Sequence, residues 1–431
     1  MISRPLFRRI ALFLALSLAM LTGFASACTP VRHVLVTADP LALGPPARPD
    51  LFAALPEAPQ ARLQAWRELH PDLLEQLSTH IYGASPPDPG PVTLSAWSEV
   101  SASTEPGERF ITDATIQVDG AGPLTVQLAL VMPAPDRPVR GVLLVPSECG
   151  LQAALHDPAM PAPDGFKPSY CDADGWLADL IGPLFGEWIS GPPAARVLDH
   201  GYAIAAWHES DIAPDSAALH DTALSALGLD PATEDRPGVI SLWAWTISRV
   251  IDAIEEDPRF VDAPFIAYGH SRRGKAVLLA AARDERIAVT LSHQSGTGGA
   301  ALQNDRVGEP VASIVETYPH WFAPRYGDYA DGGAELPIDQ HALLALIAPR
   351  AVLIGAAWRD VWADPAGAFR AAEAASPAWA IYNRPGLIQN RMGEFDPSGG
   401  VASHIRPGTH GVTDADWNAF LAFMDAHTVA P

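Results

Sequence analysis

Residues 265–275 read FIAYGHSRRGK, in which an apolar run stops at Gly269, a serine follows at Ser271 and a second glycine follows at Gly274. Small residues on both sides of a serine are typical of a tight, strained turn from a β-strand into an α-helix, which lifts the serine hydroxyl above the end of a sheet. The spacing is GxSxxG rather than the commoner GxSxG. The stretch predicts that Ser271 is a nucleophile, although a serine that merely caps a helix after a buried strand gives the same local pattern.

From about residue 110 the chain alternates short apolar runs with stretches of helical periodicity. Residues 239–254 place apolar side chains at helical intervals just before the Ser271 strand, and residues 276–282 continue the helix after it. A hairpin followed by alternating strands and helices is typical of an α/β fold, with a mostly parallel central sheet and helices on both faces. The expected strands are residues 114–118, 124–132, 141–145, 202–207, 265–268, 288–292, 351–357 and 379–382.

The first 27 residues have the pattern of a signal peptide: arginines near the start, an apolar stretch at 10–21, and Ala-Ser-Ala at 25–27. We therefore expect export, to the periplasm or the medium. Cys28 follows directly, so a lipid anchor on that cysteine is an open alternative.

Residues 28–114 are rich in proline and poor in strand patterns, with one amphipathic stretch at 61–77. We interpret them as an N-terminal segment that wraps around the rest and carries no recognisable chemistry. The catalytic domain is expected over residues 115–431.

The charge of the chain limits its partners. Three of its 28 basic residues and none of its 50 acidic residues lie in the first 27 positions, which leaves 25 basic against 50 acidic residues and a formal charge of −25. This excess argues against nucleic acid and anionic membrane surfaces as partners. No segment after the leader is long and apolar enough to predict a membrane span, and we expect a monomer.

Two cysteines follow Cys28, at Cys149 and Cys171. In an oxidising compartment this pair is a candidate disulfide, and two free buried thiols are the alternative.

The general base should be a histidine near the end of the chain, because the order in such hydrolases is nucleophile, acid, histidine. Of the 14 histidines, only His404, His410 and His427 follow the last expected strand. His410 lies in a glycine-flanked loop just before a helix expected from about residue 414, which favours it as the base. His404, which we place in a similar loop, is the alternative, whereas His427 falls in or beyond the final helix.

The acid should be a carboxylate just past a late strand, where it can hold the histidine tautomer. Asp360 lies three residues beyond the expected strand 351–357, and Asp364 lies seven residues beyond it. Asp364 precedes Pro365 and so has the pattern of a helix cap. We therefore predict Asp360 as the acid, with Asp364 as the alternative.

Further motifs follow the nucleophile in order: SGTGGAAL, Gly308-Glu309, YPHWF at 318–322, LPIDQHALLALIAPR at 336–350, WADP at 362–365 and a late GTHG. Together with GHSRRGK, they resemble the bacterial glucuronoyl esterases of carbohydrate esterase family 15 over about residues 115–427. The resemblance implies an α/β-hydrolase fold and cleavage of the ester between 4-O-methyl-glucuronic acid on xylan and alcohols of lignin. It also implies that no metal or other cofactor is needed.

Carried over residue by residue, the family pattern makes Ser271 the nucleophile and His410 the base. It makes Arg272 a contributor to the oxyanion hole through its amide and side chain. By the same resemblance, Lys275 and Glu309 would bind hydroxyls of the glucuronoyl ring, and Trp362 would line its face. An aromatic wall and fixed donors and acceptors suit a polyhydroxylated ring.

One position departs from the family pattern. Many members carry a catalytic glutamate where this chain has Gln294, and an amide cannot stabilise an imidazolium as a carboxylate does. We interpret this as relocation of the acid to Asp360, with Gln294 left to form hydrogen bonds in the site or with substrate.

The predicted activity is acyl transfer from a glucuronate ester to water. An acetyl-xylan or broad-specificity carboxylesterase keeps the same catalytic residues and is the alternative within enzymes. A non-catalytic carbohydrate-binding protein with a hydrolase fold is the alternative of another class, motivated by Gln294.

Overall fold

The computed structural model describes residues 49–87, 90–172, 186–304, 307–330 and 335–428. The expected signal peptide and Cys28 lie outside the described residues. Within the described ranges, no helix combines the length and apolar character that a membrane crossing requires.

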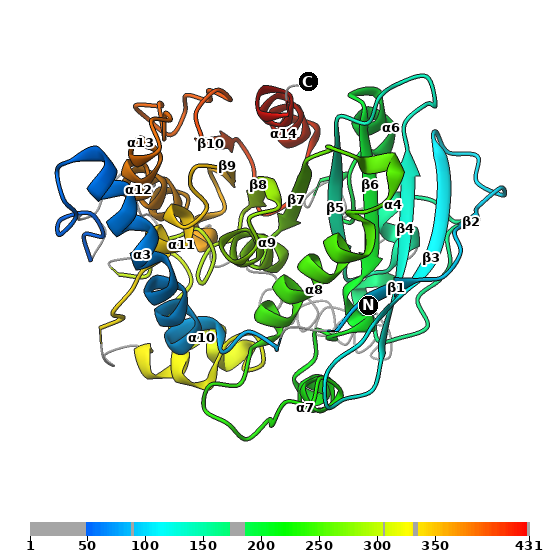
Figure 1. The fold of residues 1–431 in the computed structure, drawn as a ribbon, viewed down its shortest axis with the longest axis horizontal. Helices are drawn as coiled ribbons and strands as arrows, with labels where there is room; N and C mark the ends of the chain where they lie inside the picture. The colour runs from blue at the N-terminus through cyan, green and yellow to red at the C-terminus, as the bar shows by residue number, and fades with distance from the viewer. Residues whose placement is uncertain (1–48, 88–89, 173–185, 305–306, 331–334, 429–431) are drawn as a thin grey trace, which may run out of the picture.

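The fold is built on one ten-stranded sheet (Figure 1). The main path runs β1-β3-β4-β6-β5-β7-β8-β9-β10, and β2 pairs with β3 at the side. The strands from β6 to β10 along this path are parallel, whereas β4 is antiparallel to both of its neighbours. The strands are β1 (Val92–Leu94), β2 (Ser98–Glu99), β3 (Glu108–Ile116), β4 (Leu124–Met132), β5 (Gly141–Ser147), β6 (Tyr202–His208), β7 (Phe265–His270), β8 (Ile287–His293), β9 (Ala351–Ala357) and β10 (Val401–Arg406).

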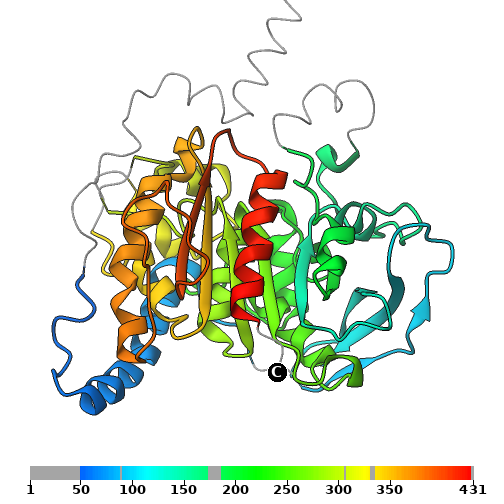
Figure 2. The same ribbon diagram turned by 90° about the horizontal axis from the view of Figure 1, so that it is seen from above.

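Helices cover both faces of this sheet. Strand side chains alternate between the two cores, so that Val142 and Leu144 of β5 join one apolar cluster and Leu143 and Val145 join the other. Helices α3, α8, α9, α11 and α12 pack on the first core, and α4, α6 and α14 pack on the second. Figure 1 shows α14 and α8 on opposite sides of the sheet, and Figure 2 shows α14 (red) in front of the strands. The helices are α3 (Pro59–Leu77), α4 (Leu151–Leu155), α6 (Ala194–Asp199), α7 (Ala217–Ala226), α8 (Val239–Ile254), α9 (Arg272–Arg283), α10 (Val311–Thr317), α11 (Gln340–Ala345), α12 (Pro365–Ala375), α13 (Pro377–Ile381) and α14 (Asp414–His427).

The sequence pattern placed most of these elements but was wrong about the last strand. Residues 379–382, expected as a strand, belong largely to helix α13, which begins at Pro377. The edge strand is instead β10, and His404 lies in it rather than in a loop. Its polar side chains hid it from pattern analysis, and the fold gives them partners: His404 lies 3.5 Å from Asp416, and Arg406 pairs with the same carboxylate.

The N-terminal part of the described chain packs on the same core. Trp66 of α3 is fully buried, and α3 contacts α11 and α13. The Tyr82 hydroxyl bonds the backbone of Gly298 at 3.0 Å, next to the loop that follows β8. β1, β2 and most of β3 precede residue 115 and share the sheet. The division of the chain at residue 114 stays a prediction.

Candidate active site

Ser271 lies on a strained turn between β7 and α9. Its backbone has φ 57° and ψ −124°, a conformation that is costly for a residue with a side chain. The turn is held because the Ser271 amide donates to the carbonyl of His293 at 2.8 Å. A Cβ at Gly269 would lie 2.3 Å from the Arg273 carbonyl oxygen, so only glycine fits there. The flanking glycines of the motif are therefore explained by close backbone packing.

His410 and Asp360 meet at the same end of the sheet. His410 Nδ1 lies 2.7 Å from Asp360 Oδ2, and the Asp360 side chain is almost fully buried. Asp360 follows β9 and His410 follows β10, and these strands are parallel. The His410 ring also packs against the ring of His270, with centroids 4.6 Å apart. Because His270 directly precedes Ser271, this contact brings His410 close to the turn that carries the predicted nucleophile.

The alternative residues have other surroundings. Asp364 caps α12 by accepting from the Gly367 amide at 2.8 Å, and His427 contacts the carbonyls of Pro397 and Gly399. His404 lies 3.5 Å from Asp416. The geometry thus favours His410 and Asp360 over each alternative.

Gln294 forms two hydrogen bonds with the loop that carries His410. Its amide nitrogen donates to the Thr409 carbonyl at 3.2 Å, and its amide oxygen accepts from the Gly411 N–H at 2.8 Å. These partners flank His410 on both sides, and Gln294 is only 4% exposed. The side chain that replaces the family's glutamate is therefore engaged with backbone on both of its polar ends.

Behind His410 lies a polar layer that the sequence did not predict. His270 Nδ1 faces His293 Nδ1 at 3.0 Å, so one of these nitrogens must carry a proton and the other must accept. His293 Nε2 lies 3.2 Å from Asp416, which Arg406 also contacts. Burial holds the pKa of His270 well below its ordinary value, and so keeps that ring neutral.

Among the described residues, no group of His, Cys, Asp and Glu side chains is arranged to hold a metal ion.

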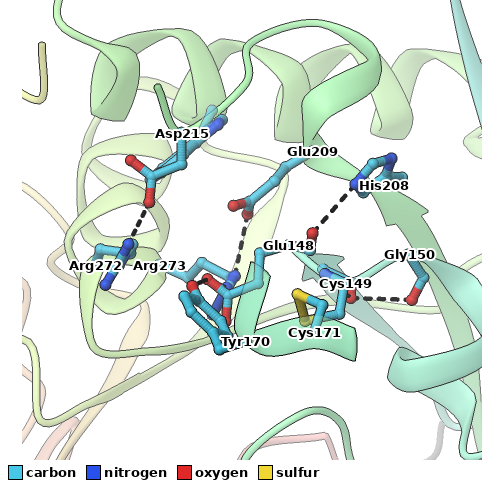
Figure 3. Close-up of polar contacts among 12 residues, drawn as sticks. Glu148, Cys149, Gly150, Tyr170, Cys171, His208, Glu209, Asp215, Arg272 and Arg273 are labelled. Atoms are coloured by element: carbon cyan, nitrogen blue, oxygen red, sulfur yellow. Dashed lines mark hydrogen bonds and ion pairs between the residues drawn. A yellow bond between two sulfur atoms is a disulfide. The ribbon is translucent and has the colours of Figure 1, made fainter. Parts of the chain in front are cut away.

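The two arginines after Ser271 point into separate carboxylate clusters (Figure 3). Arg272 pairs with Asp215. Arg273 is shared between two carboxylates, with Nη2 at 2.5 Å from Glu148 and Nε at 3.0 Å from Glu209. Sequence reasoning missed all three acidic partners, because each comes from a loop after β5 or β6 that is distant in the chain.

The shared guanidinium separates the pKa values of its two carboxyl groups. Burial opposes ionisation of Glu148, but Arg273 and Arg272 outweigh it and lower its pKa. Burial raises the pKa of Glu209 to about 7, against the opposing effect of Arg273. Glu209 therefore holds a proton under conditions in which Glu148 is ionised.

A disulfide joins Cys149 to Cys171, across 22 residues. It fixes the loop after β5 to the segment that carries Tyr170, whose hydroxyl donates to Glu148 at 2.6 Å (Figure 3). The covalent link thus stabilises the loop that brings Glu148 to Arg273.

Lys275, Glu309 and Trp362 form a third polar group near the turn. The ammonium of Lys275 is buried and donates to the carbonyls of Ser295 and Thr297. Burial lowers the pKa of Lys275 to about 8, and the nearby Glu309 opposes this shift. Burial raises the pKa of Glu309, and the nearby charge of Lys275 opposes this increase. The Glu309 amide donates to the Trp362 carbonyl at 2.9 Å, and both side chains are half-buried.

Comparisons with known proteins agree with this architecture. The family model described as "Glucuronyl esterase, fungi" matches residues 196–383. The chain is 38% identical over 251 residues to carbohydrate esterase MZ0003 from an unknown prokaryotic organism, and the matched region covers 57% of each chain. It is 34% identical over 199 residues to a 4-O-methyl-glucuronoyl methylesterase of Schizophyllum commune, covering 44% of this chain and 49% of that protein. The chain therefore spans about half the length of these curated relatives.

Solved structures match over most of the chain. A CE15 esterase from a marine bacterial metagenome, described as promiscuous, has a TM-score of 0.76 and 28% identity over 90% of this chain and 99% of that one. A glucuronoyl esterase from Solibacter usitatus has a TM-score of 0.74 and 28% identity over 89% of this chain and 98% of that one. The sheet order and the turn at Ser271 define an α/β-hydrolase. Within that class, the chain is similar to the glucuronoyl esterases of carbohydrate esterase family 15, so the family resemblance seen in the sequence is confirmed.

The two hydrogen bonds of the Gln294 side chain predict the effect of replacing it with glutamate. In Gln294→Glu the side chain can still accept from Gly411 but cannot donate to Thr409, and a carboxylate oxygen would face that carbonyl. We expect the free energy of unfolding to fall by about 1–3 kcal/mol, the cost of an unsatisfied buried group. Urea denaturation measures this, with the exposed substitution Gln60→Glu as the control. A Gln294→Glu protein as stable as the wild type would contradict a stabilising role of these two hydrogen bonds.

The raised pKa of Glu209 predicts a specific pH dependence of stability. Between the unfolded value of 4.5 and the folded value of about 7, the native state keeps a proton that the unfolded chain releases. The stabilisation is therefore complete below about pH 4.5 and is lost as the pH rises through about 7. Glu209→Gln stays neutral throughout, so we expect the wild type to lose stability relative to this variant between pH 5 and 8. Denaturation series at several pH values test this; Glu99→Gln, at an exposed site, should track the wild type. Parallel curves for wild type and Glu209→Gln would refute the assignment.

Proposed function

We propose that this protein is a serine-type carboxylic ester hydrolase that cleaves 4-O-methyl-glucuronoyl esters linking glucuronoxylan to lignin alcohols. The observation that carries the proposal is the 2.7 Å contact between His410 and Asp360, placed beside the strained turn of Ser271. Such a contact orients the imidazole and stabilises the imidazolium that forms when it accepts a proton.

The proposed reaction is acyl transfer in two halves. His410 takes the proton of the Ser271 hydroxyl, whose oxygen attacks the ester carbonyl and forms a tetrahedral oxyanion. The charge of Arg272 and backbone amides at the start of α9 stabilise that oxyanion, at about 3 kcal/mol for each well-placed donor. The alcohol leaves with the proton from His410. Water, activated by the same histidine, then releases the glucuronate and restores Ser271.

The group at Lys275, Glu309 and Trp362 supports a uronic acid as the acyl part. A buried ammonium and a half-buried carboxyl supply a donor and an acceptor for ring hydroxyls, and an indole suits the apolar face of a sugar. Xylan-linked glucuronate esters are the substrate class that the family relationship favours. Gln294 is left out of the substrate contacts proposed here, because its amide is occupied by the His410 loop.

We also propose that the protein acts after export. The leader pattern of the sequence supports this, and so does the Cys149–Cys171 disulfide, since such bonds persist in oxidising compartments. Anchoring through Cys28 and the monomeric state stay predictions.

Hydrolysis of benzyl glucuronate tests the catalytic assignment. We expect Ser271→Ala to lower kcat at least about 10³-fold and Asp360→Asn to lower it by a similar order, because the three residues act as a unit. Asp364→Asn is the matched control: its side-chain oxygen can still accept from the Gly367 amide and cap α12, so we expect it to leave kcat within a few fold of the wild type. Full activity of Asp360→Asn would remove it from the mechanism, and failure of a fluorophosphonate to label wild-type Ser271 would favour the non-catalytic alternative.

A comparison of two esters tests the substrate class. We expect Glu309→Gln to raise KM for benzyl glucuronate several-fold, because a neutral amide oxygen is a weaker acceptor for a ring hydroxyl than a carboxylate, and to leave hydrolysis of p-nitrophenyl acetate unchanged. Wild-type rates on the acetyl ester that match or exceed those on the uronate would instead support a broad-specificity carboxylesterase.

A further inference from the structure

Asp215 collects three donors around one buried carboxylate. Its Oδ1 accepts from His320 Nε2 at 2.8 Å and from Trp321 Nε1 at 2.7 Å, while Oδ2 pairs with the Arg272 guanidinium. The Asp215 side chain is 5% exposed. Burial opposes its ionisation, but the His320 bond and Arg272 outweigh it, so that its pKa lies below the ordinary value. Asp215 therefore presents a full negative charge to Arg272.

Aromatic rings hold the plane of the same guanidinium. The Arg272 carbon Cζ lies 4.7 Å from the ring centroid of Trp321 and 5.5 Å from that of Tyr318. These two rings are stacked on one another, with centroids 3.7 Å apart and planes 4° from parallel. A guanidinium packed on aromatic rings and paired with a carboxylate is restrained both in its plane and in its rotation.

The parts of this arrangement are fixed to the scaffold. The carbonyl of His320 accepts from the Val239 amide at 2.8 Å and that of Trp321 accepts from Ile240 at 3.3 Å, which ties the segment to the start of α8. Asp215 lies between β6 and α7, where the Trp243 indole bonds the nearby Ala213 carbonyl at 2.8 Å. The YPHWF stretch at 318–322, whose role the sequence left open, thus supplies both the rings and the donors.

We propose that Asp215, held by His320 and Trp321, is a positioning residue that fixes the Arg272 side chain beside the nucleophile for stabilisation of the oxyanion. This inference rests on the proposed function, because Arg272 has this task only if Ser271 attacks an ester. The physical reason is preorganisation: an arginine fixed before the reaction need not be ordered as negative charge develops. A carboxylate of purely structural value would instead act on stability without regard to Arg272.

A double-mutant cycle separates the two roles. The cycle compares four proteins: wild type, Asp215→Asn, Arg272→Ala and the double variant. For each, we measure the second-order rate at which a fluorophosphonate labels Ser271, a reaction that needs no sugar. We also measure kcat and KM on benzyl glucuronate. We expect Asp215→Asn to slow labelling and kcat about 10- to 100-fold with little change in KM, and to have no further effect once Arg272 is alanine. Asp257→Asn, which breaks an aspartate–arginine pair elsewhere, is the matched control and should leave both rates unchanged.

Two outcomes of the cycle overturn the inference. Equal effects of Asp215→Asn with and without Arg272 would show a structural role, and no effect in either background would show no role. If Asp215→Asn does not fold, Trp321→Phe removes the indole donor and keeps a smaller aromatic ring near Arg272, and we expect a several-fold loss in the same cycle. Labelling without hydrolysis of benzyl glucuronate would reject the substrate class yet leave the cycle valid. Absence of labelling in the wild type would reject the proposed function, and this inference with it.

Discussion

The left-handed backbone turn at Ser271 is the constraint on which the rest of the site depends. It is held by the His293 carbonyl and by Gly269, which lies too close to the Arg273 carbonyl for any side chain. Because the turn joins β7 directly to α9, it sends the neighbouring side chains in different directions, and each ends in its own polar cluster. The pairs are His270 with His293, Arg272 with Asp215, Arg273 with Glu148 and Glu209, and Lys275 with the carbonyls of Ser295 and Thr297.

The position of the acid and the identity of residue 294 are physically linked. Asp360 reaches His410 from β9, so the residue after β8 is free to serve another purpose. The His410 loop presents the Thr409 carbonyl just before the histidine and the Gly411 N–H just after it. An amide matches that pair of groups and a carboxylate does not. Gln294 is thus suited to a site in which the acid comes from the next strand.

Sequence patterns predicted what depends on local chemistry. The bounds of β4 and β9 follow from largely apolar runs, those of α8 follow from apolar side chains at helical intervals, and the turn at Ser271 follows from its glycines. The α/β-hydrolase fold is confirmed. What escaped is long-range: β10 was missed because partners such as Asp416 satisfy its polar residues, and residues 379–382 were misread because a short apolar run fits a buried helix as well as a strand. The carboxylates at positions 148, 209 and 215 carry no local signal, since only strand order brings them together.

The balance of charge around the adjacent arginines explains why Glu209 keeps its proton. Arg272 and Arg273 bring two positive charges into a buried region, and Asp215 and Glu148 offset both of them. A third ionised carboxylate would leave an uncompensated negative charge, which burial makes costly. Protonation of Glu209 avoids that charge and leaves a hydrogen-bond acceptor for Arg273. Since an added negative charge here would oppose the formation of an oxyanion at Ser271, the neutral form of Glu209 is also the form that suits the proposed chemistry.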